Sequence, residues 1–262
     1  MKQEAYMEAA RLLWENWDTR ILLEDLRRHF CLEEETDGHA IQNALPAVAE
    51  QTHAGWKIAA TSLAGQKHIN VNGPIAGRLL SGRILAEGEE CSLAANSMGV
   101  MEAEFAFRFG ETVPLRDSAY TPEEVLARVS ELRLAIELPD SRFKDFTSVG
   151  KAHLIADNAC AWWLLEGRKV ESGWRETDLC DHVVKVFLNG KQAAEGRGAN
   201  VLGDPRKALA WLVNDVTSRG GTIGEGELVT TGTCIIPVPV KTGDQVLADF
   251  GSFGTVEIRF SG

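Results

Sequence analysis

The sequence predicts an α+β fold built on a curved mixed sheet, because helical and strand patterns occupy different parts of the chain. The first 55 residues carry apolar side chains at helical spacing, in AYMEAARLLWENW and again in HAIQNALPAVAEQ after the acidic LEEETDG break. Beyond residue 55, short strand patterns and glycines dominate and helices become isolated. Strands and helices therefore do not alternate as they do in a doubly wound fold. We expect an N-terminal helical region over 1–55 and a β-rich domain over 56–262.

Within the β-rich part, two segments predict helices and one predicts a tight hairpin. TPEEVLARVSEL, residues 121–132, begins with Thr121 as N-cap, Pro122 in the first turn and Glu124 completing a capping box. The segment 204–221 begins with Asp-Pro and ends at two glycines. LNGK at 188–191 predicts a type I′ turn between two strands. The chain has no GxGxxG or GxxxxGK[ST] motif, so nothing indicates a dinucleotide or P-loop site.

Composition narrows the class of protein. The 262 residues carry a formal net charge of -11, which argues against non-specific binding to nucleic acid or to an anionic membrane. The amino-terminal residues lack the apolar core of a signal peptide, and no run approaches the roughly 18–20 apolar residues of a membrane span. We expect a cytoplasmic protein with free thiols, since its five cysteines are scattered without a CxxC pair: Cys31, Cys91, Cys160, Cys180 and Cys234.

Two glutamates stand two residues apart inside the apolar run GVMEAEFAFRFG, residues 99–110. Strand side chains alternate between faces, so Glu102 and Glu104 would share one face, whereas on a helix they would diverge. The opposite face would be apolar, formed by Met101, Ala103 and the three phenylalanines of the run. Two like charges at one place indicate either a solvated outer face or a cation site.

A third carboxylate follows a similar pattern in LRLAIELPDSRF, residues 132–143. Leucine and isoleucine side chains alternate onto one face, and Glu137 lies on the other, at the end of the predicted strand. Three carboxylates from two strands could converge on one hard divalent cation, because Mg²⁺ and Mn²⁺ prefer oxygen ligands. A Glu-x-Glu pair is more often a solvated strand face, so spacing alone leaves both interpretations open.

The order of motifs along the chain carries a family resemblance. The motifs are GWKIAATS, EAEFAF, AIELPDSR, IADNAC, NVLGDPRKALAWLVN and TTGTCIIPVPVKTGDQVLADFGSFGTVEIRF, from about residue 36 to the C-terminus. Together they resemble the 2-keto-4-pentenoate hydratase and 4-oxalocrotonate decarboxylase group of the fumarylacetoacetate hydrolase superfamily. The resemblance implies a mixed β-roll with flanking helices, so that 56–262 would be the catalytic domain. It also implies Mg²⁺ or Mn²⁺ held by Glu102, Glu104 and Glu137.

The resemblance also implies site residues outside the three carboxylates. Lys57 of GWKIAATS matches an active-site lysine that binds a substrate oxyanion or relays a proton, as a desolvated lysine with a lowered pKa can do. Asp157 and Asn158 match a substrate-binding stretch of the group. Cys160 replaces the usual serine there, which weakens or removes a hydroxyl donor.

Further positions either match or depart from the group's pattern. Thr231 and Thr233 stand where the group commonly has serines that bind the substrate carboxylate, although threonines in a strand need no such role. Ile75 replaces an aspartate that many members carry after the proline of VNGPIAGRLL. Arg78 is a candidate partner for a second substrate carboxylate or a surface residue, and Arg142 is expected to pair with a neighbouring carboxylate.

These features lead to one main function and several alternatives. The resemblance implies a lyase that hydrates a small 2-hydroxy-2,4-dienoate to a 4-hydroxy-2-oxo acid in aromatic-compound catabolism. The alternatives are a 4-oxalocrotonate decarboxylase, an acylpyruvate-type C–C hydrolase, or a noncatalytic partner subunit. A homo-oligomer is also implied, with association with a related pathway enzyme as a further option.

Overall fold

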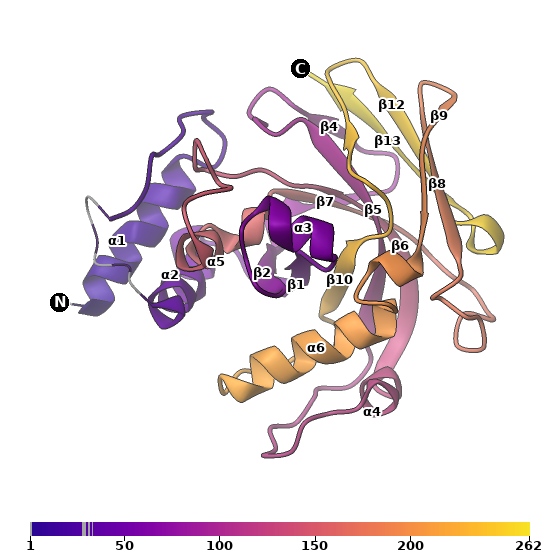
Figure 1. Cartoon of the computed structure of the whole chain (residues 1–262), viewed down its shortest axis with the longest axis horizontal. Helices are drawn as coiled ribbons and strands as arrows, with labels where there is room; N and C mark the ends of the chain where they lie inside the picture. The colour runs from indigo at the N-terminus through magenta and orange to yellow at the C-terminus, as the bar shows by residue number, and fades with distance from the viewer. Residues whose placement is uncertain (1, 28–29, 31, 33) are drawn as a thin grey trace.

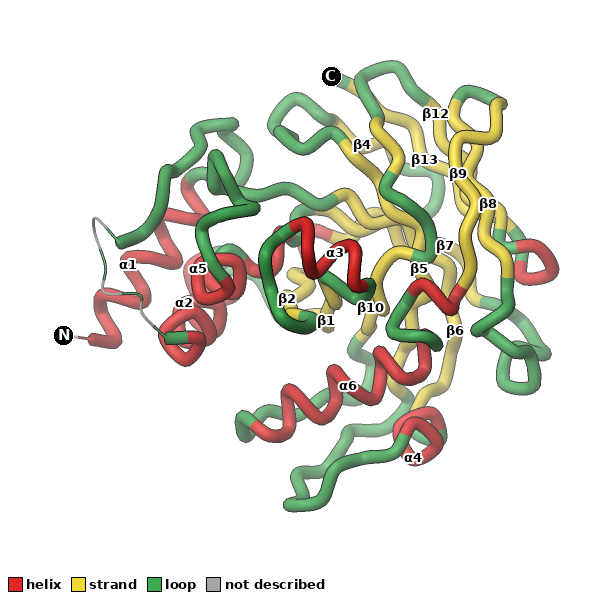
Figure 2. Tube along the Cα trace, viewed as in Figure 1, coloured by secondary structure: helices red, strands yellow, loops and turns green. Residues whose placement is uncertain are grey.

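The computed structural model describes residues 2–27, 30, 32 and 34–262, and its framework is a pair of β-sheets (Figures 1 and 2). The larger sheet has the spatial order β2 (Ile75–Leu80), β1 (His53–Ala59), β10 (Leu228–Thr233), β5 (Val100–Phe109), β6 (Val129–Leu138), β7 (Trp163–Lys169) and β3 (Ile84–Ala86), with β11 (Val238–Pro239) paired to β5. The smaller sheet has the order β4 (Glu90–Ser92), β13 (Thr255–Ser261), β12 (Gln245–Asp249), β8 (Val183–Leu188) and β9 (Lys191–Arg197). The helices are α1 (Lys2–Glu15), α2 (Glu35–Val48), α3 (Leu63–His68), α4 (Pro122–Leu126), α5 (Lys151–Ala156) and α6 (Pro205–Ser218).

The larger sheet curls into a half-barrel, and its connectivity shows why. Strands β2 and β3 lie at opposite edges of the sheet, yet only residues 81–83 connect them along the chain. Such a short connection requires the two edges to lie close together, so the sheet must curl. Strands β1 and β10 pair in parallel, as do β3 and β7, while the other pairs are antiparallel, so the sheet is mixed. One cluster of small and branched apolar side chains packs within this sheet: Leu79, Ala106, Ala135, Leu164 and Leu228. The predicted α+β class with a curved mixed sheet is therefore confirmed.

The alternation predicted for β5 and β6 is present in the structure. Met101, Ala103 and Phe105 are fully buried in the main core, which also receives side chains from α6 and from the smaller sheet. Glu102 lies opposite Glu137 in the antiparallel register of β5 and β6. The two glutamate-bearing faces are thus one continuous surface.

The N-terminal helices form a second layer with α5, at the left of Figure 1. Their apolar side chains belong to a separate core cluster that includes Leu13 and Ile41 from this region together with Ile75, Phe143 and Leu154 from the rest of the chain. The 1–55 region therefore packs directly against elements from the 56–262 part.

The predicted helix start at Thr121 and the predicted type I′ turn at 188–191 are both confirmed, although the helix is shorter than predicted. The capping box of Thr121 and Glu124 begins α4, but this helix ends at Leu126, because Val129 already pairs with Phe109 in the sheet. The hairpin turn has positive φ at Asn189 and Gly190, as a type I′ turn requires. Cys91, Cys160, Cys180 and Cys234 are free thiols, and Cys31 lies outside the described residues. No helix in the described part of the chain is both long and apolar enough to span a bilayer.

Candidate metal centre

Glu102, Glu104 and Glu137 converge at one end of the β5–β6 pair. One carboxylate oxygen from each lies within 4.8 Å of the others. Glu104 and Glu137 are buried, with 0% and 2% of their surface exposed, while Glu102 is half-buried. Burial of this kind excludes the solvated outer face that the spacing had left open.

We call the three carboxylates of Glu102, Glu104 and Glu137 the cage. Beside the cage, Lys57 projects from β1. Its Nζ lies 2.7 Å from Oε1 of Glu137 and donates a hydrogen bond to the carbonyl oxygen of Ala159 at 2.9 Å. Gly77 faces Lys57 across the β1–β2 ladder, and a Cβ at Gly77 would lie 2.9 Å from Cδ of Lys57. The bare glycine therefore leaves the room in which the lysine side chain extends.

The electrostatics of this cluster are those of negative charges held out of water. Burial, followed by the charge of Glu137, raises the pKa of Glu102 to about 7. Burial and the charges of Glu137 and Glu102 raise the pKa of Glu104 well above its usual range. Burial alone would lower the pKa of Lys57, but the neighbouring carboxylates outweigh it and hold that pKa above its ordinary value. The expectation of a lowered pKa for Lys57 is thus wrong for the metal-free protein, because Glu137 stabilises the charged ammonium.

The donor set fits a hard divalent cation. Oε1 of Glu104 and Oε2 of Glu137 are buried and have no hydrogen-bond partner among the described residues. A buried carboxylate oxygen without a partner is unfavourable unless a cation or a water satisfies it. The donors are all oxygens, which suits Mg²⁺ or Mn²⁺ better than the softer ions that sulfur or imidazole ligands select.

Asp157, Asn158 and Cys160 lie together in the short turn 157–160 after α5, close to Lys57 through the Ala159 carbonyl. The Asp157 carboxylate is fully buried and accepts hydrogen bonds from Ser141 Oγ at 2.6 Å and from Nε of Arg142 at 2.5 Å. These contacts tie Asp157 to Ser141 and Arg142, and with 0% of its surface exposed it is enclosed by protein atoms. Arg142 pairs with a carboxylate, as expected.

The other two predicted residues of this turn are Asn158, which is hydrogen-bonded to β2, and Cys160, which is a buried thiol. The Asn158 side chain binds the backbone of Arg78 on β2, accepting from its N–H and donating to its carbonyl. Burial, followed by the charge of Asp157, raises the pKa of the Cys160 thiol to about 12, so this cysteine is not a thiolate nucleophile at neutral pH.

The two threonines of TTGTC differ in position. Thr233 pairs with Glu104 in the β10–β5 register, beside the cage, and its hydroxyl donates to the carbonyl of Ile235 at 3.0 Å. Thr231 is fully buried and its hydroxyl donates to the carbonyl of Phe105 at 3.1 Å. Between them, the N–H of Gly232 donates to Oε2 of Glu104 at 2.9 Å.

Ile75 and Arg78 have surroundings that differ from those expected of site residues. Ile75 is 2% exposed and belongs to the apolar cluster beneath the N-terminal helices. Arg78 pairs with Trp56 across the ladder, on the face opposite Lys57. Its guanidinium lies over the Trp56 ring at 4.4 Å and donates to Asn43. The structure therefore does not place Arg78 where it could receive a carboxylate bound at the cage.

Sequence reasoning missed the groups that support the site through backbone atoms. They are the Ala159 carbonyl that binds Lys57, the Gly232 N–H that binds Glu104, and the bare Cα of Gly77. The glycines of IAGRLL and TTGTC were the available signals, since a strand glycine often marks a close backbone approach.

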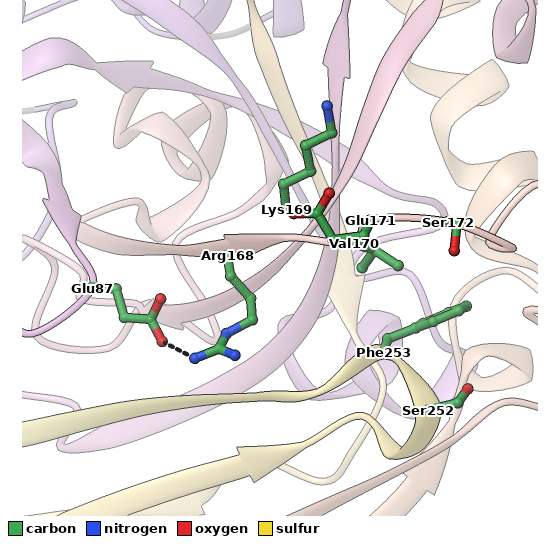
Figure 3. A pocket seen from close by; sticks show the side chains of 8 residues that line it. All are labelled: Glu87, Arg168, Lys169, Val170, Glu171, Ser172, Ser252 and Phe253. Carbon is green, nitrogen blue, oxygen red and sulfur yellow. Dashed lines mark hydrogen bonds and ion pairs between the residues drawn. The ribbon is translucent and has the colours of Figure 1, made fainter.

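A surface cavity of about 410 Å³ lies elsewhere, between the end of β7 and residues 252–253 (Figure 3). Its lining includes the ion pair between Arg168 and Glu87, in which Nη2 of Arg168 lies 3.1 Å from Oε1 of Glu87. None of the three clustered glutamates lines it, and neither does Lys57.

The structure is thus a β-roll protein in which three convergent carboxylates and a buried lysine form a candidate cation site. Residues 80–261 match the family described as fumarylacetoacetate (FAA) hydrolase C-terminal. The chain belongs to this family, and the resemblance of its sequence motifs is confirmed.

The relatives are hydratases and a decarboxylase. The chain is 30% identical to a 2-hydroxyhexa-2,4-dienoate hydratase of Comamonas testosteroni, over 79% of this chain and 78% of the relative. It is 28% identical to a 4-oxalocrotonate decarboxylase of a Pseudomonas species, with the same coverage. The solved structure of 4-oxalocrotonate decarboxylase from Pseudomonas putida G7, complexed with magnesium and adipate, has the same fold, with a TM-score of 0.89 at 24% identity over 99% of this chain and 98% of that one.

Proposed function

We propose that this protein is a divalent-metal-dependent hydro-lyase that adds water to a 2-hydroxy-2,4-dienoate and yields a 4-hydroxy-2-oxo acid. One observation carries the proposal: three buried or half-buried carboxylates converge beside a buried lysine in a chain related to dienoate hydratases. Substrates of this class combine a carboxylate with an adjacent oxygen at C2, so both functional groups of the substrate are oxygen donors.

Glu102, Glu104 and Glu137 would hold Mg²⁺ or Mn²⁺ through one carboxylate oxygen each. When bound there, such a cation supplies positive charge that polarises the substrate oxygens and stabilises negative charge developing on the C2 oxygen. The Gly232 N–H keeps one Glu104 oxygen oriented, which leaves the other oxygen of that carboxylate free to act as a ligand.

Lys57 acts on the substrate oxygen in this proposal. An ammonium has three N–H donors, and the contacts of Lys57 with Glu137 and with the Ala159 carbonyl account for two of them. The third is available to the C2 oxygen or to a proton relay. Because the side chain is 3% exposed, water competes weakly for that donor and the hydrogen bond is strengthened.

The reaction balances with water as the only co-substrate. The dienol loses its hydroxyl proton and gains a proton at the far carbon, which gives an unsaturated 2-oxo acid. Water then adds across the remaining double bond, its oxygen to C4 and its proton to C3. We place the substrate carboxylate beside Thr233, the predicted threonine that lies opposite Glu104. Cys160 directly follows Ala159, whose carbonyl binds Lys57, and we assign it to the edge of the same site.

The test is direct assay with a defined metal. Purified protein is incubated with Mg²⁺ or Mn²⁺ and 2-hydroxypenta-2,4-dienoate, and the products are identified by mass spectrometry. We expect the gain of one water, lost in the metal-free protein and in Glu104→Gln. Recovery of unchanged substrate at all metal concentrations would refute a dienoate hydratase.

Decarboxylation is the second candidate, because the chain is also 28% identical to a 4-oxalocrotonate decarboxylase. The same cage would stabilise the electron pair released as CO₂ leaves from a 2-oxo-3-hexenedioate. Parallel incubation with that diacid separates the two: release of CO₂ without water gain favours the decarboxylase. We further propose a homo-oligomer that acts in the cytoplasm, which light scattering of the purified protein and cell fractionation would test.

A further inference from the structure

Residues 158–160 form a left-handed turn of an uncommon kind. Asn158, Ala159 and Cys160 have φ values of 55°, 53° and 59°, three consecutive residues that each carry a Cβ. Such residues visit this region rarely and usually singly, since Cβ approaches the following carbonyl. A strained conformation persists only where the surrounding structure enforces it, and such strain gathers at functional sites.

The first restraint on the turn is the Asn158 side chain. Its Oδ1 accepts from the N–H of Arg78 at 2.6 Å and its Nδ2 donates to the carbonyl of Arg78 at 2.8 Å. The amide thereby uses the free edge of β2 as a backbone neighbour would. The turn is fixed to the strand that also carries Gly77, where a Cβ would lie 2.4 Å from the carbonyl oxygen of Asn158.

The second restraint is Arg142, which is 1% exposed. Its guanidinium donates to the carbonyl of Asp157 before the turn and to the carbonyl of Ala161 after it, the latter at 2.9 Å. Its Nε binds the Asp157 carboxylate, and the group stacks over Trp17 at 3.8 Å from the ring centroid. One side chain therefore holds both ends of the turn.

The consequence of these restraints is felt at Lys57. The turn aims the carbonyl of Ala159 at Nζ of Lys57, 2.9 Å away, and Oε1 of Glu137 lies 2.7 Å from the same atom. A lysine ammonium is a flexible point charge that rotates freely unless acceptors fix it. With both acceptors in place, the remaining N–H has one direction.

We propose that Asn158 and Arg142 are positioning residues that orient the Lys57 ammonium through this left-handed turn. The inference rests on the catalytic role proposed for Lys57. It assigns Asn158 to the support of the lysine instead of direct substrate contact. It also links the N-terminal segment to catalysis, because Trp17 backs the guanidinium that holds the turn.

The first test is Asn158→Gly, which removes the amide clamp while glycine accepts the left-handed conformation without strain. The matched control is Glu50→Gly, since Glu50 also has a positive φ, of 53°, but is exposed and remote from the turn. A change in kcat that comes only from the greater backbone flexibility of glycine would appear in both variants.

The second test is Arg142→Lys, because lysine cannot reproduce the planar fork that reaches both carbonyls. Its control is Arg175→Lys. The Arg175 guanidinium also lies over a tryptophan, 4.2 Å from the Trp174 ring centroid, and also donates to two backbone carbonyls, those of Leu126 and Val129, neither of which belongs to the turn. Should Arg142→Lys fail to fold, Asn158→Gly alone decides the question.

Two readouts separate positioning from mere structural support. We expect kcat to fall by about tenfold to a hundredfold in both test variants, with KM and Mn²⁺ affinity nearly unchanged, because a displacement of about 1 Å can cost a hundredfold in rate. We also expect the ε-methylene NMR signal of Lys57, assigned with Lys57→Met in ¹³C-lysine-labelled metal-free protein, to shift in the test variants only.

An unshifted Lys57 signal in both test variants would overturn the inference, as would equal losses of kcat in the controls. If the wild-type protein turns over neither dienoate nor diacid, the proposed function fails, and the NMR comparison still decides whether the turn orients Lys57.

Discussion

Nζ of Lys57 lies 2.7 Å from Oε1 of Glu137, and both side chains are almost fully buried. Glu137 therefore serves two neighbours, since its carboxylate also belongs to the cluster formed with Glu102 and Glu104. A single ammonium offsets only part of the charge of three carboxylates. Burial, and after it the repulsion between these carboxylates, raises the pKa values of Glu102 and Glu104, and a divalent cation would remove the charge imbalance.

Stability should therefore depend on the metal. We expect Mg²⁺ or Mn²⁺ at 100 times its Kd to stabilise the protein by about 2.7 kcal/mol, measured as an increase in Tm by calorimetry. Glu104→Gln should abolish the increase, because it removes an unpartnered ligand oxygen. Glu131→Gln, on the same strand as Glu137 but paired with Arg133 and Lys169, should keep it; loss in both variants would contradict the assignment.

Lys57→Met separates catalysis from metal binding. Turnover should fall by about 10²–10⁴-fold, the usual contribution of a group that moves or holds a proton, while the metal-induced rise in Tm persists, because the three carboxylates remain. Lys169→Met removes a lysine of the same sheet that pairs with Glu131 outside the cage, and its turnover should match that of the wild-type protein. Steady-state assay and calorimetry on the same preparations check both statements.

Much of the fold and the cage could be predicted from the sequence, because both follow from period-two alternation. The alternation predicts which side chains of β5 and β6 are buried in the core, and the structure confirms it. The same alternation by itself places Glu102 and Glu104 on one face. Convergence with Glu137 required the register that sets Glu102 opposite Glu137. Spacing within one strand carries no information about a register between strands, so the family resemblance supplied this step.

The rest of the site depends on contacts between distant segments and could not be predicted. The direction of the Lys57 pKa shift is set by Glu137, 80 positions away along the chain, whose charge outweighs burial. The left-handed turn at 158–160 contradicts the local preference of its own residues, and contacts with residues distant in the sequence, among them Arg78 and Arg142, hold it. Tertiary structure overrides local propensity at this point, as it often does near functional sites.

Gly77→Ala should disturb the position of Lys57 for steric reasons alone. The added Cβ would lie 2.4 Å from the carbonyl oxygen of Asn158 and 2.9 Å from Cδ of Lys57, so backbone or lysine must move. We expect a lower Tm and a loss of turnover. Gly73→Ala, four residues earlier, has nothing within 4 Å of the new methyl group and should change neither. Equal behaviour of the two alanine variants would count against the fit of Lys57 in this space.

The Arg142–Asp157 ion pair should contribute strongly to stability. Asp157→Asn leaves the guanidinium buried without its counter-charge, and breaking a buried pair in this way costs about 3–5 kcal/mol. Glu24→Gln breaks the pair with Lys144, whose side chains are 61% and 67% exposed, and such surface pairs contribute roughly 0–1 kcal/mol. Urea unfolding of both variants, with equal m-values, measures the difference. Similar midpoints would show that the buried pair contributes little.

Ile75 tests whether the aspartate expected from the family resemblance has a place in this chain. The side chain is 2% exposed in an apolar cluster that also contains Leu13 and Ile155. Ile75→Asp should destabilise the protein by about 3–5 kcal/mol, since it buries a charge without a partner, and should not raise turnover. Ile75→Val, which only removes a methylene, should cost about 0.5–1.5 kcal/mol. If Ile75→Asp instead folds normally and turns over substrate faster, the position reaches the site, and the apolar packing seen around Ile75 has replaced a working acid.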